Sequence, residues 1–161
     1  MNDSIERKQK IAYKVNLKDH LTELSYFSQK PVTEASLLSI EETKKIMNIK
    51  ISDQAVTTRF TIPFKDKNLP RFALFIDLLY KQNPGPMFIW TKFSEICGCI
   101  KINSIKEFNF EFPFSASSHG IVTLITKDIT DKMVLDYYLD EEDKEMLEVS
   151  LIGNNWSAIR Y

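Results

Sequence analysis

The stretch KMVLDYYLDEEDKEMLEVSLIG (132–153) decides the fold, because apolar and polar residues alternate on both sides of an acidic break. Alternation with a period of two is typical of strands that bury one face. The pattern predicts a strand over 132–140, a turn at 141–144 and a second strand over 145–153. Two such runs joined by so short a connection predict an antiparallel hairpin.

Residue parity divides this hairpin into two faces. The inward side chains are expected to be Met133, Leu135, Tyr137, Leu139, Leu147, Val149 and Leu151. The outward side chains are then Val134, Asp136, Tyr138, Asp140, Met146, Glu148, Ser150 and Ile152. Carboxylates mixed with aromatic and aliphatic groups are typical of a contact surface. The hairpin therefore predicts an acidic sheet face that contacts a partner.

Further strands are expected on both sides of the hairpin. IVTLITK (121–127) predicts a strand that completes a C-terminal β-meander. The runs over 58–64 and 108–114 also alternate, with phenylalanine at Phe60, Phe64 and at every second position of the later run. Each contains a proline that lacks a ladder donor, so edge positions or strand ends are expected.

Helical signals fill the N-terminal part of the chain. IAYKV (11–15) alternates like a strand, whereas the leucine spacing over 17–27 predicts a helix. Ser39 and Glu42 form a capping-box pattern for a helix that ends near Ile49. The segment 69–82 has the clearest helical stripe, with Asn68 as its expected cap and apolar residues on most sides.

These signals predict an α+β fold, with an N-terminal helical portion packed on an antiparallel sheet that ends in a C-terminal β-meander. The chain of 161 residues is expected to form a single domain over 1–161. It contains no apolar run of the ~20 residues that span a bilayer, and its first thirty residues have no signal-type apolar stretch. We therefore expect a cytoplasmic protein with no membrane partner.

Charge is concentrated in one segment. The chain carries a net −1, but residues 128–148 contain nine Asp/Glu and two Lys/Arg. Phosphate recognition requires clustered Lys and Arg, so we expect no nucleic-acid partner for this segment. A partner with a basic surface is expected instead, because opposite potentials speed the encounter of two proteins.

Known catalytic and metal-binding motifs do not fit. DEEDKE lacks the glycine of an EF-hand loop and has Lys144 at a ligand position. The four glycines are too far apart for a phosphate loop. Cys97 and Cys99 offer too few ligands for structural zinc and are expected to be ordinary reduced thiols. We therefore predict no catalytic residues, no metal site and no cofactor.

Three catalytic or contact alternatives stay open on the sequence. Asp136 and Glu148 lie at a cross-strand spacing that a glycosidase pair would need. His119 beside Ser117 and Ser118 is a candidate general base, although a backbone hydrogen bond is the more frequent role of such a histidine. Trp156 either clamps the last segment onto the sheet or serves as an interface hot spot.

The favoured hypothesis is a non-enzymatic protein-binding domain. Its candidate partner-binding residues are Asp136, Tyr138, Asp140, Glu145, Glu148 and Trp156. The acidic DYYLDEEDKEMLE, the antiparallel ending LIGNNW and the absence of a catalytic motif resemble in type the bacterial immunity proteins that neutralise toxins of contact-dependent competition. The resemblance implies a toxin domain, often a basic nuclease, as the partner.

The alternative hypothesis is a small-ligand-binding protein or hydrolase. Its pocket would lie between the Phe-rich strands and the 69–82 helix, since eleven phenylalanines are enough to line a cavity. The sequence leaves the oligomeric state open.

Overall fold

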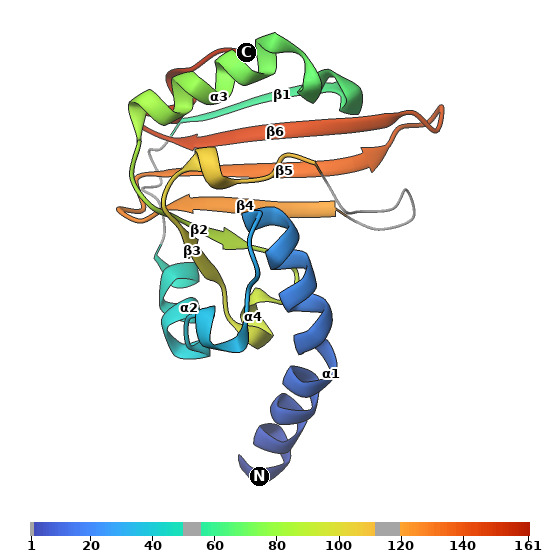
Figure 1. The fold of residues 1–161 in the computed structure, drawn as a ribbon, viewed down its shortest axis with the longest axis vertical. Coiled ribbons are helices and arrows are strands. Elements are labelled where there is room, and N and C mark those ends of the chain that lie inside the picture. Colours follow the sequence, from blue (N-terminus) through green and yellow to red (C-terminus); the bar gives the residue numbers. More distant parts are fainter. Residues whose placement is uncertain (1, 50–55, 112–119) are drawn as a thin grey trace.

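The computed structural model describes residues 2–49, 56–111 and 120–161, and an antiparallel sheet of six strands forms its centre (Figure 1). The strand order is β1-β6-β5-β4-β2-β3. The strands are β1 (Thr57–Pro63), β2 (Met87–Trp90), β3 (Ile100–Ile102), β4 (Gly120–Thr126), β5 (Asp131–Leu139) and β6 (Glu145–Gly153). The predicted α+β class is confirmed.

The C-terminal meander has the predicted strands and parity. β4, β5 and β6 are successive antiparallel neighbours, with Asp136 opposite Glu148. The predicted inward residues are buried, except that Leu139 at the end of β5 is only half-buried. The alternation predicted the buried side chains correctly because, along most of the hairpin, helices cover just one face of the sheet.

The two Phe-rich runs behave differently. The first is β1, an edge strand whose final residue is Pro63, as predicted. The second forms no strand within its described part, residues 108–111. Phe108 instead follows the 3₁₀ helix η3 (Ile105–Glu107) and stacks on Phe27, with ring centroids 5.1 Å apart. Phe112 and Phe114 lie outside the described residues.

The first helix is longer than predicted. α1 (Asn2–Ser28) includes IAYKV, so the predicted strand over 11–15 is wrong. Five alternating residues are too few to outweigh flanking segments rich in helix-forming Lys, Gln, Glu and Leu. The first turns of α1 are exposed and extend away from the sheet, whereas its last turns join the core (Figure 1).

The second helix, α2 (Ile40–Asn48), confirms the predicted capping box. The Ser39 hydroxyl accepts from the Glu42 amide at 3.1 Å, and the Glu42 carboxylate accepts from the Ser39 amide at 3.1 Å. The latter contact, together with the Ser39 hydroxyl, lowers the pKa of Glu42. Between α1 and α2 lies a short 3₁₀ helix, η1 (Glu34–Ser36).

The third helix, α3 (Pro70–Gln82), begins with proline in its first turn as predicted, but Leu69 and not Asn68 is its N-cap residue. Asn68 belongs to the preceding 3₁₀ helix η2 (Phe64–Asn68). Only one side of α3 is buried, since Leu74 and Leu78 are 64 % and 45 % exposed. The expectation of a helix covered on most sides is wrong, because the sheet packs against one stripe alone.

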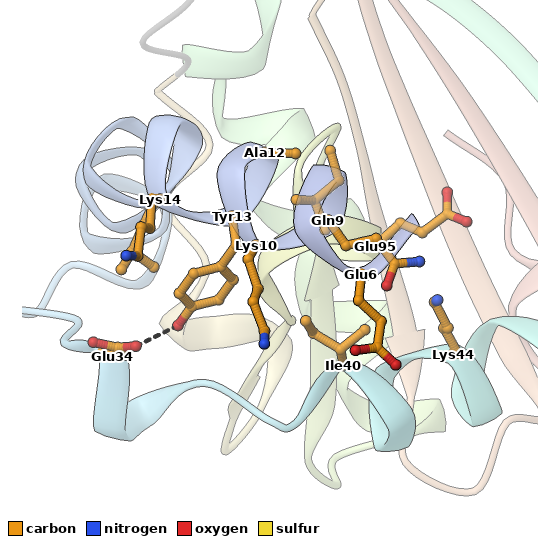
Figure 2. A pocket seen from close by; sticks show the side chains of 12 residues that line it. Glu6, Gln9, Lys10, Ala12, Tyr13, Lys14, Glu34, Ile40, Lys44 and Glu95 are labelled. Carbon is orange, nitrogen blue, oxygen red and sulfur yellow. Dashed lines mark hydrogen bonds between the residues drawn. The ribbon is translucent and has the colours of Figure 1, made fainter. Parts of the chain in front are cut away.

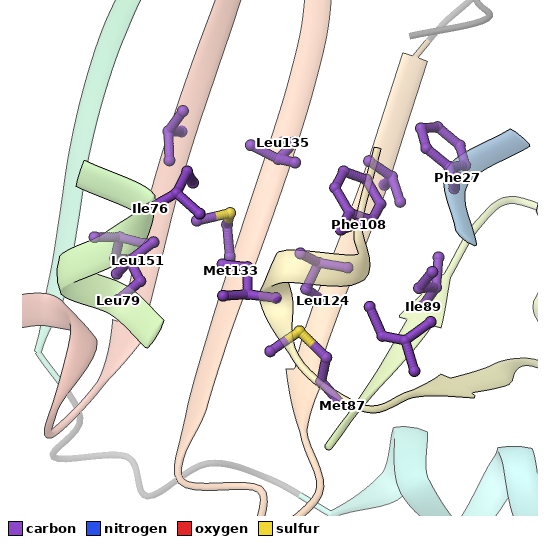
Figure 3. Packing of buried hydrophobic residues seen from close by; sticks show 14 of the residues in the cluster. Phe27, Ile76, Leu79, Met87, Ile89, Phe108, Leu124, Met133, Leu135 and Leu151 are labelled. Carbon is purple, nitrogen blue, oxygen red and sulfur yellow. The ribbon is translucent and has the colours of Figure 1, made fainter. Parts of the chain in front are cut away.

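The core lies between the helices and one face of the sheet (Figure 3). Side chains from α1, α3 and η3 pack there on the inward residues of the strands. The largest members include Phe27, Phe75, Leu79, Met87 and Tyr137. The chain ends in a 3₁₀ helix, η4 (Trp156–Ala158). Among the described helices, none is long and apolar enough to cross a membrane.

Candidate protein-binding surface

The sheet face opposite the core presents a patch near the β5–β6 turn. The register places Ile121, Asp136 and Glu148 side by side across β4, β5 and β6, with Tyr138 opposite Met146 in the next row. Ile121 is 49 % and Tyr138 37 % exposed. We call these residues the open-face patch: Ile121, Asp136, Tyr138, Met146 and Glu148.

The patch is mixed in charge and not uniformly acidic. Arg59 on β1 approaches Glu148, with Nε 3.4 Å from Oε1. Lys132 lies on the same face further along β5 by parity. The prediction of an acidic face therefore needs correction, because the edge strand adds a cation that the hairpin sequence alone does not contain.

Asp140 has a structural role in the turn. Its Oδ1 accepts from the amides of Glu142 (2.8 Å) and Lys144 (2.9 Å). The Lys144 amide is the main reason that the pKa of Asp140 is lowered. The exposed acids that follow form a solvated turn, in which Lys144 pairs with Glu142.

Glu145 lies apart from the patch. Its parity is that of the inward residues, and its Oε1 accepts from the Tyr137 hydroxyl at 2.7 Å. Burial and this contact raise the pKa of Tyr137 to about 12. Glu145 thus has the parity of Leu147 and not of Glu148, so it lies outside the open-face patch; its side chain is exposed, and its contact with a partner stays a prediction.

Trp156 is fully buried, so the prediction that it contacts a partner is wrong. Its ring Nε1 donates to the Leu79 carbonyl at 3.1 Å, which attaches the C-terminal segment to α3. Its amide donates to Asp131 Oδ1 at 2.9 Å. Of the two roles that the sequence left open, the clamp is the one observed.

Two residues of this region were missed at the level of sequence. Ile121 is placed outward by the parity of β4, in which Val122 and Leu124 are buried, and its register opposite Asp136 brings it into the patch. Asp131 is a fully buried carboxylate that accepts from Asn155 and Trp156, and also from Thr130 and Asn83. It looks like an ordinary turn residue in the sequence.

The predicted ligand pocket between α3 and the Phe-rich segments is filled by aromatic rings. Phe72 and Phe110 have centroids 5.4 Å apart, and Phe108 and Phe110 4.8 Å. The Tyr161 ring stacks on Phe60 at 4.9 Å. Within the described residues, aromatic rings thus occupy the space in which the sequence predicted a pocket, and the hydrolase or ligand-binding alternative stays a prediction.

A groove of about 620 Å³ lies elsewhere, between α1, η1, α2 and α4 (Ser94–Cys97) (Figure 2). The Tyr13 hydroxyl donates to Glu34 Oε1 at 2.5 Å across its wall. This hydrogen bond is the main cause that raises the pKa of Tyr13 to about 12. Ile40 and Ile96 contribute apolar surface, while the rim carries lysines and glutamates in equal number.

A buried polar cluster surrounds the Cys97-Gly98-Cys99 segment. His20 Nε2 donates to the Gly98 carbonyl at 2.6 Å, and burial lowers the pKa of His20. Both cysteines are buried free thiols, and burial raises the pKa of each. Gly98 has φ of 100°, and a Cβ there would meet the Leu38 carbonyl oxygen at 2.3 Å.

The described residues were also searched for groups of side chains that could hold a metal ion. Within residues 2–49, 56–111 and 120–161, no three His, Cys, Asp or Glu side chains are placed to hold a metal ion. Ser117, Ser118 and His119 lie outside the described residues. Comparison with family models, curated proteins and solved structures found no match for the chain.

Proposed function

We propose that the chain is a non-enzymatic protein-binding domain that contacts its partner through the open-face patch. The observation that carries this proposal is the exposure of Tyr138 and Ile121 beside Asp136 and Glu148 on one sheet face. Aromatic and aliphatic groups supply most of the affinity in protein interfaces, and the charges around them favour complementary partners.

A basic partner is supported by the charge around the patch. The acidic turn over 140–145 adjoins Tyr138 and Met146, and three of its carboxylates, Glu141, Asp143 and Glu145, appear in no ion pair among the described residues. Arg59 forms an ion pair with Glu148 on the neighbouring strand. A toxin domain with a basic surface suits this distribution, so we propose that the protein acts as an immunity protein.

Co-expression tests this function directly. The probe is a toxin domain with a basic surface, taken from the exported protein of a neighbouring gene where the genome carries one, and expressed in a host that it inhibits. We expect this chain to restore growth, and its Tyr138→Ala variant to restore it less. Growth that stays inhibited with the wild-type chain present would refute the immunity function.

A further inference from the structure

The outer edge of β1 has backbone groups that no other described strand pairs with. The Gly153 amide donates to the Val56 carbonyl at 3.2 Å, just before β1 begins. Backbone groups of a strand point alternately to its two sides. The backbone N–H and C=O groups of Thr58, Phe60 and Ile62 therefore point toward β6. The intervening residues point their N–H and C=O groups outward.

The position of Pro63 agrees with this assignment. Its missing N–H falls on the outward side, where no bond to β6 is lost. Among the described residues, none hydrogen-bonds to the backbone of Thr57, Arg59 or Thr61 on that side. The side chains of these three residues are exposed as well. Such an edge is ready to pair with another strand.

We propose that β1 pairs with β1 of a second copy of this chain. The two strands run antiparallel about a twofold axis at Phe60, which joins two sheets into one. Arg59 then lies opposite Thr61 of the second copy and exchanges both backbone hydrogen bonds with it. At each end of the ladder, the Thr57 amide of one copy donates to the Pro63 carbonyl of the other copy.

Charge selects this register over its neighbours. An axis at Arg59 would place two guanidinium groups opposite each other, which is unfavourable. An axis at Thr61 would place Thr57 opposite Lys65, beyond the end of the strand. With the axis at Phe60, each Arg59 faces a threonine and keeps its contact to Glu148 in its own copy.

The aromatic side chains also fit the pairing. Phe60 is half-buried and stacks on Tyr161 with an interplanar angle of 7°. In the proposed dimer the two Phe60 residues form a non-hydrogen-bonded pair, the kind that brings side chains closest. The opposite sheet edge, β3, has only three residues and gives a shorter ladder. Twofold dimers are the commonest symmetric assemblies.

A matched pair of variants at Thr61 tests the dimer. Thr61→Pro removes one outward donor and no bond to β6, whereas Thr61→Ala keeps the donor. We expect the wild type and Thr61→Ala to dimerise in sedimentation equilibrium at up to ~100 µM, and Thr61→Pro to dimerise at least tenfold more weakly. A monomeric wild type would overturn the proposal, as would a Thr61→Pro dimer of unchanged strength.

Disulfide trapping tests the register without proline. Arg59→Cys and Thr61→Cys proteins are mixed and oxidised, and the proposed pair places their Cα atoms about 5.5 Å apart, within disulfide range. We expect the mixed disulfide to exceed either homodimeric disulfide. Cys97 and Cys99 are buried and should stay reduced. Equal yields of all three products would refute the register.

The proposed dimer and the proposed protein-binding function are tested independently of each other. The open-face patch lies on β4, β5 and β6, and the proposed dimer contact lies on the outer edge of β1. Tyr138→Ala should therefore leave dimerisation unchanged.

Discussion

Asp131 holds the C-terminal segment onto the sheet. Its buried carboxylate accepts from the amides of Asn155 (3.0 Å) and Trp156 (2.9 Å). Asp131→Ala leaves these donors without their partner, so we expect the free energy of unfolding to fall by about 3 kcal/mol. Chemical denaturation measures the change. Glu141→Ala, on the exposed turn, is the control and should stay within about 0.5 kcal/mol of the wild type.

His20 makes stability depend on pH. Burial lowers its pKa, so the unfolded chain binds a proton at a higher pH than the folded protein does. The unfolded state therefore holds more protons below about pH 6.5, and stability falls as the pH drops through that range. We expect His20→Gln to weaken this pH dependence in denaturation midpoints between about pH 7.5 and 5.5. An unchanged dependence would contradict the assignment.

Single residues were the hardest feature to predict from sequence. Tyr138 and Glu148 were placed on the correct face because strand parity is local. The burial of Trp156 and the hydrogen bond between Tyr137 and Glu145 were not predicted, since they depend on contacts with α3 and with β5. A local pattern contains no information about such distant contacts.

Among the elements, α2 owes its start to the Ser39 capping box. Ser39→Ala removes the acceptor for the Glu42 amide, so we expect a loss of about 1 kcal/mol in the free energy of unfolding. Thermal or chemical denaturation measures it. Ser36 precedes the helix, and Ser36→Ala changes η1 but not the α2 cap. Equal losses in the two variants would argue against a specific capping effect.

Elements with a strong period and clear ends were predicted well. β6 has the bounds Glu145–Gly153 that the sequence indicated, because a turn precedes it and alternation is unbroken. Residues 11–15 and 108–111 were assigned to strands wrongly. Short alternating runs also arise inside a helix such as α1 and in an aromatic cluster such as that of Phe27, Phe108 and Phe110.

At the scale of the whole molecule, one sheet face is packed by helices and the other presents the patch. The order of the elements in the sequence predicted the α+β class, but it did not predict the pairing of β1 with β6. This pairing places Arg59 beside Glu148 and adds a positive charge to the open face of the sheet. Long-range pairing therefore decides what the surface offers to a partner.

The proposed function requires that Tyr138 and its neighbours bind a basic protein. Titration calorimetry with the toxin domain of the co-expression test measures this binding, with Leu74→Asp on the exposed side of α3 as the control. We expect Tyr138→Ala to weaken binding at least tenfold, about 1.4 kcal/mol, and Leu74→Asp to leave it unchanged. Unchanged affinity in Tyr138→Ala, or a greater loss in Leu74→Asp, would contradict the proposed function.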